Sequence, residues 1–174
     1  MPQEKALRDA SQRVFSLLQS RTDMLVLSES CTSGAIAAAL GMVPGVSANF
    51  CGSHVIYRNA SKQLWLGISD EILDGPGPIS PECSRALCEA ALERTPESNL
   101  SLAITGDLGP GADAGRDGMT FVCVQRRGGD GRETSHHLSA PSPCDTQDIL
   151  GRETRQKEAT LFALSYLADY LRTA

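Results

Sequence analysis

A cluster of hydroxyl, thiol and carboxylate side chains follows the apolar run Leu25-Val26-Leu27 and is the first place where this sequence could carry chemistry. The cluster reads Glu29-Ser30-Cys31-Thr32-Ser33-Gly34, and an alanine-rich segment begins directly after it. This order predicts a strand, a polar turn and a helix, which places small nucleophilic side chains at the carboxyl edge of a sheet. Backbone N–H groups of the turn and the positive end of the helix would stabilise an anion there. In an arbitrary turn of this kind, Ser30 or Thr32 is more often only a helix N-cap.

A serine nucleophile needs a base, and Lys62 is the candidate that the sequence offers. Ser30 is a weak nucleophile unless another group takes its proton. No Ser-His-Asp set is convincing, because His54 lies in an apolar alternation that is typical of a strand. A lysine can act as the base when burial favours its neutral form. The alternative is a solvated helix residue, which is the usual role of lysine.

Tyr57, Cys31 and a glycine-rich loop could complete such a site. Tyr57 lies close to Lys62 in the sequence and could relay a proton or hold the lysine, or it is a half-buried sheet residue. Cys31 is either a rival nucleophile or a buried structural thiol. The glycines within 106–115 let the backbone approach a ligand closely, but the loop lacks the Gly-Lys-Ser ending of a Walker loop. Phosphate binding and a plain wide turn both remain open for it.

Alternating helices and strands are expected to position these residues. Apolar spacing, capping residues and chain breakers predict the elements, with Asn59 as an N-cap, Ser80 or Pro81 as a helix start, and Gly128 to Gly131 as a hairpin turn. Helices are expected over residues 3–20, 33–41, 81–94 and 145–171, and the segment 58–62 turns into a further helix that ends at about Leu66. Strands are expected over 23–28, 53–57, 100–105, 118–126 and 132–138. This pattern predicts an α/β fold, a three-layer α/β/α sandwich on a five-stranded mixed sheet with one antiparallel strand.

Composition narrows the class of protein. The 174 residues predict one domain over residues 1–174, and 41% hydrophobic with 21% charged residues is typical of a soluble globular protein. A net charge of -5 argues against nucleic acid as a partner, although it allows a small anionic ligand. No apolar run is long enough to span a membrane.

Cysteine usage and the start of the chain indicate a cytoplasmic protein. The six cysteines include no C-x-x-C pair, and the first residues are polar rather than an apolar leader, which favours reduced thiols. Zinc binding is not expected either. Cys83 and Cys88 lie in a predicted helix, and the adjacent His136 and His137 would point to opposite faces of a strand.

Four motifs in order resemble the CinA C-terminal domain family, which includes the PncC-type nicotinamide mononucleotide amidohydrolases. The likeness extends over nearly the whole chain. The four motifs are Glu29-Ser30-Cys31-Thr32-Ser33-Gly34, Pro44-Gly45-Val46-Ser47-Ala48-Asn49-Phe50-Cys51-Gly52, Tyr57-Arg58-Asn59-Ala60-Ser61-Lys62 and Thr105-Gly106-Asp107-Leu108-Gly109-Pro110-Gly111.

The resemblance implies hydrolysis of nicotinamide mononucleotide to nicotinic acid mononucleotide and ammonia, a step in pyridine nucleotide salvage, without metal or cofactor. By position, Ser30 would be the nucleophile, Lys62 the general base and Tyr57 an assisting group, while backbone N–H groups after Ser30 would hold the oxyanion. A homodimer is also implied. The substrate-binding residues implied are Cys31, Thr32, Ser33, Gly34, Thr105, Gly106, Gly109 and Arg155.

The sequence departs from the family pattern around the expected nucleotide pocket. Ser33 replaces a glycine, Asp107 and Leu108 add charge and bulk, and Arg116-Asp117-Gly118-Met119-Thr120 stands where Lys-Pro-Val-Gly-Thr is common. Arg155 is the nearest match to an arginine of the last helix, one residue out of register. These changes leave two alternatives open: a family member that binds a nucleotide without turnover, and a hydrolase of a different small amide.

Overall fold

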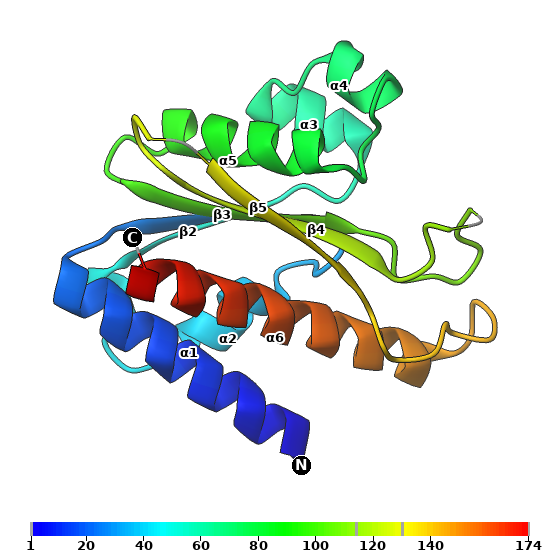
Figure 1. Cartoon of the computed structure of the whole chain (residues 1–174), viewed down its shortest axis with the longest axis horizontal. Helices are drawn as coiled ribbons and strands as arrows, with labels where there is room; N and C mark the ends of the chain where they lie inside the picture. The colour runs from blue at the N-terminus through cyan, green and yellow to red at the C-terminus, as the bar shows by residue number, and fades with distance from the viewer. Residues whose placement is uncertain (1, 114, 130, 174) are drawn as a thin grey trace.

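Helices and strands alternate along the chain in the computed structural model, which describes residues 2–113, 115–129 and 131–173 (Figure 1). Two loops singled out above, 106–115 and 128–131, each contain one residue outside this part, Ala114 and Asp130. The elements in chain order are α1 (Pro2–Arg21), β1 (Leu25–Glu29), α2 (Ala35–Gly41), η1 (Val46–Ala48), β2 (Phe50–Val55), α3 (Asn59–Leu66), α4 (Asp70–Asp74), α5 (Pro81–Arg94), β3 (Leu100–Gly106), β4 (Met119–Arg126), β5 (Gly131–His137) and α6 (Ile149–Thr173).

The five strands form one mixed sheet in the order β2-β1-β3-β4-β5. β1 pairs in parallel with both β2 and β3, whereas β4 is antiparallel to β3 and to β5, so only β4 runs against the others. In this register Glu29 lies opposite Val55 and Ile104. The carboxyl ends of β1, β2 and β3 therefore meet at one edge, as the sequence predicts.

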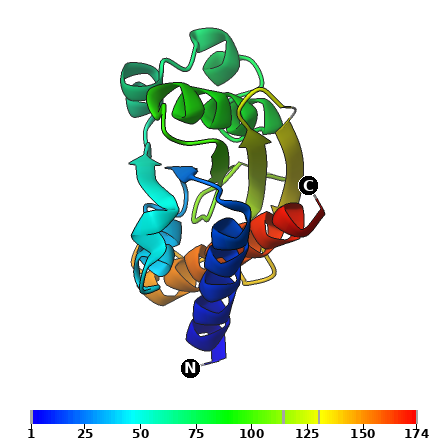
Figure 2. The same ribbon diagram turned by 90° about the vertical axis from the view of Figure 1, so that its left-hand side faces the viewer.

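Helices cover both faces of the sheet, which gives three layers. Figures 1 and 2 show α3, α4 and α5 on one face and α1, α2 and α6 on the other. Alternate residues of β1 pack into opposite layers: Leu25 and Leu27 join the core under α1 and α6, and Val26 packs with Leu92 of α5. The α/β sandwich with one antiparallel strand is thus confirmed. None of the described helices combines the length and apolar character needed to cross a membrane.

Several element starts, and the expected N-cap of α3, differ from the sequence-based expectation. β2 begins at Phe50, not at residue 53, because the Asn49 carbonyl accepts the N–H of Leu25 at 2.9 Å and brings this segment beside β1 early. Asn59 is the first residue of α3, and the extended Arg58 precedes it with no side-chain cap. The α6 helix begins at Ile149 instead of residue 145, because the Asp148 carboxylate accepts the N–H of Gly151 at 2.9 Å.

Two further features concern the α4 and α5 region. The short α4 helix was not expected from the sequence. The start of α5 is confirmed: Ser80 is its N-cap, with the hydroxyl accepting the N–H of Cys83 at 3.1 Å, and Pro81 occupies the first turn.

Candidate active site

The Ser30 hydroxyl and the Lys62 amine are brought together at the carboxyl edge of the sheet. Ser30 directly follows β1, and its N–H donates to the Ile104 carbonyl of β3 at 3.1 Å, so the sheet fixes the position of the turn. Lys62 projects from α3 and is only 2% exposed. Its Nζ lies 3.3 Å from Ser30 Oγ, which is within reach for proton transfer. The predicted serine–lysine pair is therefore present as a contact.

Burial favours the neutral form of Lys62. Desolvation lowers the pKa of the amine below its usual 10.5, and the nearby Cys83 and Cys31 oppose this effect only in part. Among the described residues, no carboxylate forms a salt bridge with Lys62. A neutral amine can accept the proton of Ser30, which is what the nucleophile requires.

Cys31 is poorly suited to be the nucleophile. Its side chain is buried, and burial raises the pKa of the thiol to about 12. Because the thiolate is the reactive form, this thiol is inert near neutral pH. Of the two candidate nucleophiles in the turn, Ser30 is the one with a base beside it.

Glu29 holds the start of α2 and was not recognised from the sequence as a structural residue. Its side chain is fully buried, and its carboxylate accepts five hydrogen bonds. The donors are Thr32 Oγ1 at 2.8 Å, the N–H groups of Gly34, Ile36 and Ala37 at 3.1, 3.0 and 2.9 Å, and Ser53 Oγ at 3.0 Å. The helix N-terminus expected to stabilise a reacting anion is thus occupied by the chain's own carboxylate.

Two backbone donors lie beside Ser30. The N–H groups of Cys31 and Thr32 donate to no oxygen in the described part of the chain. The turn closes through the Ser33 N–H, which donates to the Ser30 carbonyl at 3.1 Å, with Ser33 at a φ of 53°. Neither Ser30 nor Thr32 is the N-cap of α2, since that position belongs to Gly34. Among the described residues, the turn thus presents two N–H groups without an oxygen acceptor, which is what an oxyanion hole requires.

A cavity of about 250 Å³ opens next to Ser30. Seven of the predicted site residues line it: Ser30, Cys31, Tyr57, Lys62, Thr105, Gly106 and Gly109. Thr32, Ser33, Gly34 and Arg155 do not. Asp107 and Leu108 also line the cavity; Leu108 is mostly buried in the core, and the Asp107 carboxylate accepts the Gly109 N–H at 2.8 Å.

Arg152 is the cationic residue of this cavity that the sequence analysis missed. It lies in the first turn of α6, donates to the Tyr57 hydroxyl at 2.6 Å and also donates to the Gly109 carbonyl. Tyr57 therefore pairs with Arg152 rather than with Lys62, and its side chain is 52% exposed. The signal was an arginine near the start of the last helix, but the residue chosen was Arg155, which lies nearly one turn later.

Arg155 is buried away from the cavity. Its guanidinium pairs with both carboxylate oxygens of Asp117 at 2.6 and 2.9 Å and donates to the Ala140 carbonyl at 3.0 Å. The structure therefore does not bring Arg155 to the cavity next to Ser30, where the resemblance implied a substrate-binding role for it. Thr32, likewise outside the cavity, has its carbonyl held by the Gln156 side chain at 2.9 Å.

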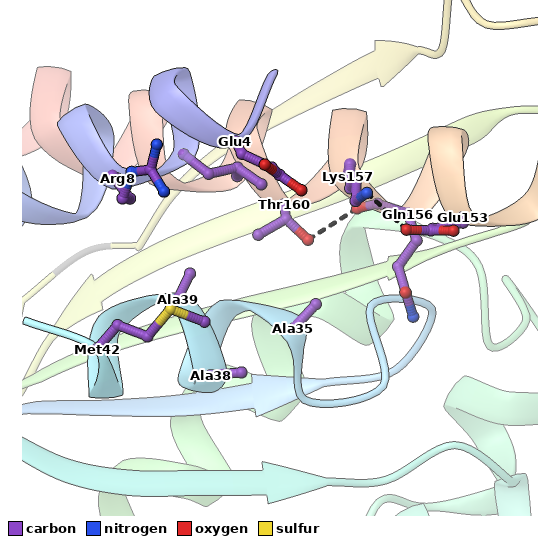
Figure 3. Close-up of a pocket in the computed structure, with 11 residues that line it drawn as sticks. Glu4, Arg8, Ala35, Ala38, Ala39, Met42, Glu153, Gln156, Lys157 and Thr160 are labelled. Atoms are coloured by element: carbon purple, nitrogen blue, oxygen red, sulfur yellow. Dashed lines mark hydrogen bonds and ion pairs between the residues drawn. The ribbon is translucent and has the colours of Figure 1, made fainter. Parts of the chain in front are cut away.

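A larger cavity, of about 590 Å³, lies between α1, α2 and α6 (Figure 3). Its floor is formed by alanines of α2, and charged residues of α1 and α6 line its sides. Lys157 in this groove pairs with Glu153 at 2.5 Å, and the Thr160 hydroxyl donates to the Gln156 carbonyl at 2.7 Å. The one hydroxyl among the described residues that line this groove therefore donates to a backbone carbonyl and not to a basic side chain. Across the described residues, no group of three His, Cys, Asp or Glu side chains could hold a metal ion.

Known proteins resemble this chain in sequence and in fold. A CinA-like protein of Prochlorococcus marinus is 37% identical over 122 residues, which is 70% of this chain and 28% of that protein. A CinA-like protein of Chloroherpeton thalassium is 33% identical over 154 residues, 86% of this chain and 35% of that protein. The chain thus spans about a third of the length of these curated relatives.

Solved structures show the same fold. A competence/damage inducible protein from Agrobacterium tumefaciens superposes with a TM-score of 0.83 at 26% identity, covering 97% of this chain and 96% of that chain. A CinA superfamily protein from Klebsiella pneumoniae gives a TM-score of 0.85 at 23% identity over 97% of this chain and 99% of that one. The family model described as CinA C-terminal domain matches residues 7–171. The chain therefore belongs to the CinA C-terminal domain family.

Proposed function

We propose that this protein is an amidohydrolase that converts nicotinamide mononucleotide and water to nicotinic acid mononucleotide and ammonia. The observation that carries the proposal is the 3.3 Å separation between Lys62 Nζ and Ser30 Oγ in a buried setting. A desolvated amine beside a hydroxyl is a general base beside a nucleophile, and acyl transfer is the chemistry that this pair performs. Membership of the CinA C-terminal domain family supports the choice of substrate.

In the acylation step, Lys62 takes the Ser30 proton while Ser30 Oγ bonds to the carboxamide carbon. The carbonyl oxygen becomes an oxyanion, and the N–H groups of Cys31 and Thr32 are the donors available to hold it. One such donor contributes on the order of 100- to 1000-fold in rate. The intermediate then breaks its C–N bond, and the Lys62 ammonium gives its proton to the leaving nitrogen, which departs as ammonia.

In the deacylation step, water hydrolyses the ester that Ser30 has formed. Lys62, neutral again, takes a proton from the attacking water, and the new tetrahedral intermediate uses the same N–H donors. The Ser30 ester bond breaks and Oγ regains its proton from Lys62. The products are the free acid and a regenerated enzyme, so no metal or cofactor is needed to balance the reaction.

The presence of Arg152 in the cavity favours a substrate with an anionic group. Two of its N–H groups are engaged by Tyr57 and Gly109, which leaves further donors of the planar guanidinium for an anion in the cavity. Arginine binds phosphate oxygens well because its donors form a fixed fork. We therefore assign recognition of the 5′-phosphate to Arg152 in place of Arg155.

Ammonia release from nicotinamide mononucleotide tests the proposal. The wild-type protein should release ammonia, and Ser30→Ala should lose the activity while keeping its melting temperature and its affinity for the nucleotide. If wild type releases no ammonia but the nucleotide raises its melting temperature, the chain is a non-catalytic binder, since a ligand bound only by the native state stabilises it.

A hydrolase of another small amide is the second candidate, and the Asp107 carboxylate in the cavity lining favours it. A panel of nicotinamide mononucleotide, nicotinamide riboside, nicotinamide and simple amides separates the two. Preference for the mononucleotide supports the first proposal. A faster rate on a neutral amide supports the second.

The same proposal treats residues 1–174 as one catalytic domain that works in the cytoplasm as a homodimer. Sedimentation of the purified chain should give twice the monomer mass of 18.5 kDa. A monomer with full activity would remove the dimer from the proposal without affecting the chemistry.

A further inference from the structure

An ion pair between a buried arginine and a partly exposed aspartate links the start of α6 to the segment that precedes β4. Arg155 is 2% exposed, and both of its terminal nitrogens contact the Asp117 carboxylate, at 2.6 and 2.9 Å. Asp117 also accepts the Ser142 hydroxyl at 2.9 Å. The Arg155 guanidinium beside it lowers the pKa of the Asp117 carboxyl, so the pair stays charged at neutral pH. Three separate segments of chain are joined at this point.

Two glycines allow the backbone to pack against this pair. A Cβ on Gly118 would lie 3.4 Å from the Arg155 guanidinium, and a Cβ on Gly109 would lie 2.6 Å from Ser142 Oγ and 3.0 Å from Asp117 Oδ1. Both glycines also have positive φ, 75° and 63°. The loop that contains Gly109 is therefore in direct contact with the ion pair, with no space for a side chain between them.

The opposite side of the same loop faces the catalytic cavity. Gly109 lines the cavity, its N–H donates to Asp107, and its carbonyl accepts from Arg152. Figure 1 shows that the β3–β4 loop and the loop before α6 project beyond the same end of the sheet. A shift of the Asp117–Arg155 pair would therefore move Gly109, and with it the contact of Arg152.

Stabilisation of the fold does not by itself account for the Asp117–Arg155 pair. The Asp117 side chain is 40% exposed, so water screens the pair and reduces its worth to the fold, while Arg155 carries a cost of burial.

We propose that Arg155 and Asp117 form a positioning pair, which holds the 106–110 loop in the geometry that binds the substrate, without touching the substrate. The proposal rests on the amidohydrolase function for its kinetic test. Arg152, nearly one turn earlier on α6, makes the cavity contact, and Arg155 fixes the loop on which Arg152 rests.

Kinetics of Arg155→Gln test the proposal first, because this variant leaves the half-exposed Asp117 to be solvated and the fold intact. KM for nicotinamide mononucleotide should rise by about tenfold with kcat within about twofold, since only the alignment of the binding loop is lost. The double variant Arg155→Gln/Asp117→Asn should be no worse than Arg155→Gln alone, as expected for partners. Arg155→Lys should restore KM only partly, because a lysine ammonium lacks the two parallel donors with which the guanidinium binds both Asp117 oxygens.

The matched control is Arg85→Gln, which breaks the exposed Arg85–Glu133 pair between α5 and β5. Its KM should equal that of wild type. If Arg155→Gln also leaves KM unchanged, or if the two single variants are additive in the double, the positioning pair is refuted.

Hydrogen exchange of the loop provides a readout that does not need activity. Amides within 107–118 should exchange about tenfold faster in Arg155→Gln than in wild type, while those of β1 stay unchanged. If Arg155→Gln exchanges faster than wild type as described, but wild type releases no ammonia, the proposed function is contradicted and the positioning pair is still supported. Unchanged exchange in an active enzyme would contradict the pair alone.

Discussion

Two cavities of this protein differ in size and in chemistry, and the smaller one contains the buried lysine. The groove between α1, α2 and α6 measures about 590 Å³, and the cavity at Ser30 about 250 Å³. In the groove, Lys157 is paired with Glu153. In the cavity, Lys62 is buried beside Ser30 without a carboxylate in salt-bridge contact among the described residues. Volume is a common first guide to an active site, but here the desolvated base distinguishes the two.

The α2 helix forms part of both regions. Its alanines line the groove, and its first turn is tied to Glu29 beside Ser30. A sheet edge with buried polar groups is costly to build unless each is satisfied, and the five hydrogen bonds of Glu29 meet that requirement.

The largest effect is expected when the lysine of each cavity is replaced separately by methionine. Lys62→Met should reduce kcat for ammonia release by about 1000-fold, because the general base is lost. Its melting temperature should be equal to or above that of wild type, since methionine fills the space without the cost of a buried amine. Lys157→Met is the matched control in the groove and should keep full activity. A loss of activity only in Lys157→Met would reverse the comparison.

The next largest effect is expected from Glu29→Gln, which should destabilise the turn after β1. A glutamine amide keeps one acceptor and places N–H donors against the backbone donors of α2, so we expect a loss of about 2 kcal/mol in the free energy of unfolding. Urea denaturation measures it. Glu133→Gln, which removes one partner of an exposed ion pair, is the control and should cost less than about 1 kcal/mol. Equal losses would mean that Glu29 does not organise the site.

The pH dependence of the rate should report Lys62. Burial lowers the pKa of this amine from 10.5, and only the neutral form can take the Ser30 proton. As pH falls below the lowered pKa, kcat/KM should fall by about tenfold per unit, and it should level off above that pKa. A pH series of ammonia release under saturating and limiting substrate checks this. A rate that rises as pH falls would exclude a lysine base.

The smallest effect is expected from Ser33→Gly. Ser33 has a φ of 53°, a conformation that costs a side-chain-bearing residue about 1 kcal/mol, so glycine should raise stability by less than that amount after its own entropy cost. Thermal unfolding measures the change. Ser33 lies outside the cavity lining, so the rate should stay within about twofold. A large loss of stability would indicate a contact of the Ser33 side chain.

The sequence was sufficient to predict the fold because its periodicities are local. The apolar run of β1 and the spacing of Val14 and Leu18 in α1 are visible in single segments, and the order of elements predicted the mixed sheet. The predicted contact of Ser30 with Lys62 followed from strands that end at one edge. Elements of a parallel sheet bring their carboxyl ends together whatever the details of their loops.

The contacts that could not be predicted depend on how α6 is rotated about its own axis and on partners that lie far apart in the sequence. Arg152 and Arg155 are three residues apart, and a helix start misplaced from 149 to 145 does not reveal which of them faces the cavity. The role of Glu29 required Ser53 of another strand and the amides of α2. Such contacts appear only when the elements are packed.

The rate of ammonia release by Ser30→Ala, measured beside Cys31→Ala, tests the central claim most directly. Ser30 has the base beside it, whereas burial raises the pKa of the Cys31 thiol to about 12. We expect Ser30→Ala to release no ammonia from nicotinamide mononucleotide and Cys31→Ala to keep a rate within about threefold of wild type, since its backbone N–H remains. Ammonia release by Ser30→Ala at the wild-type rate would contradict the account.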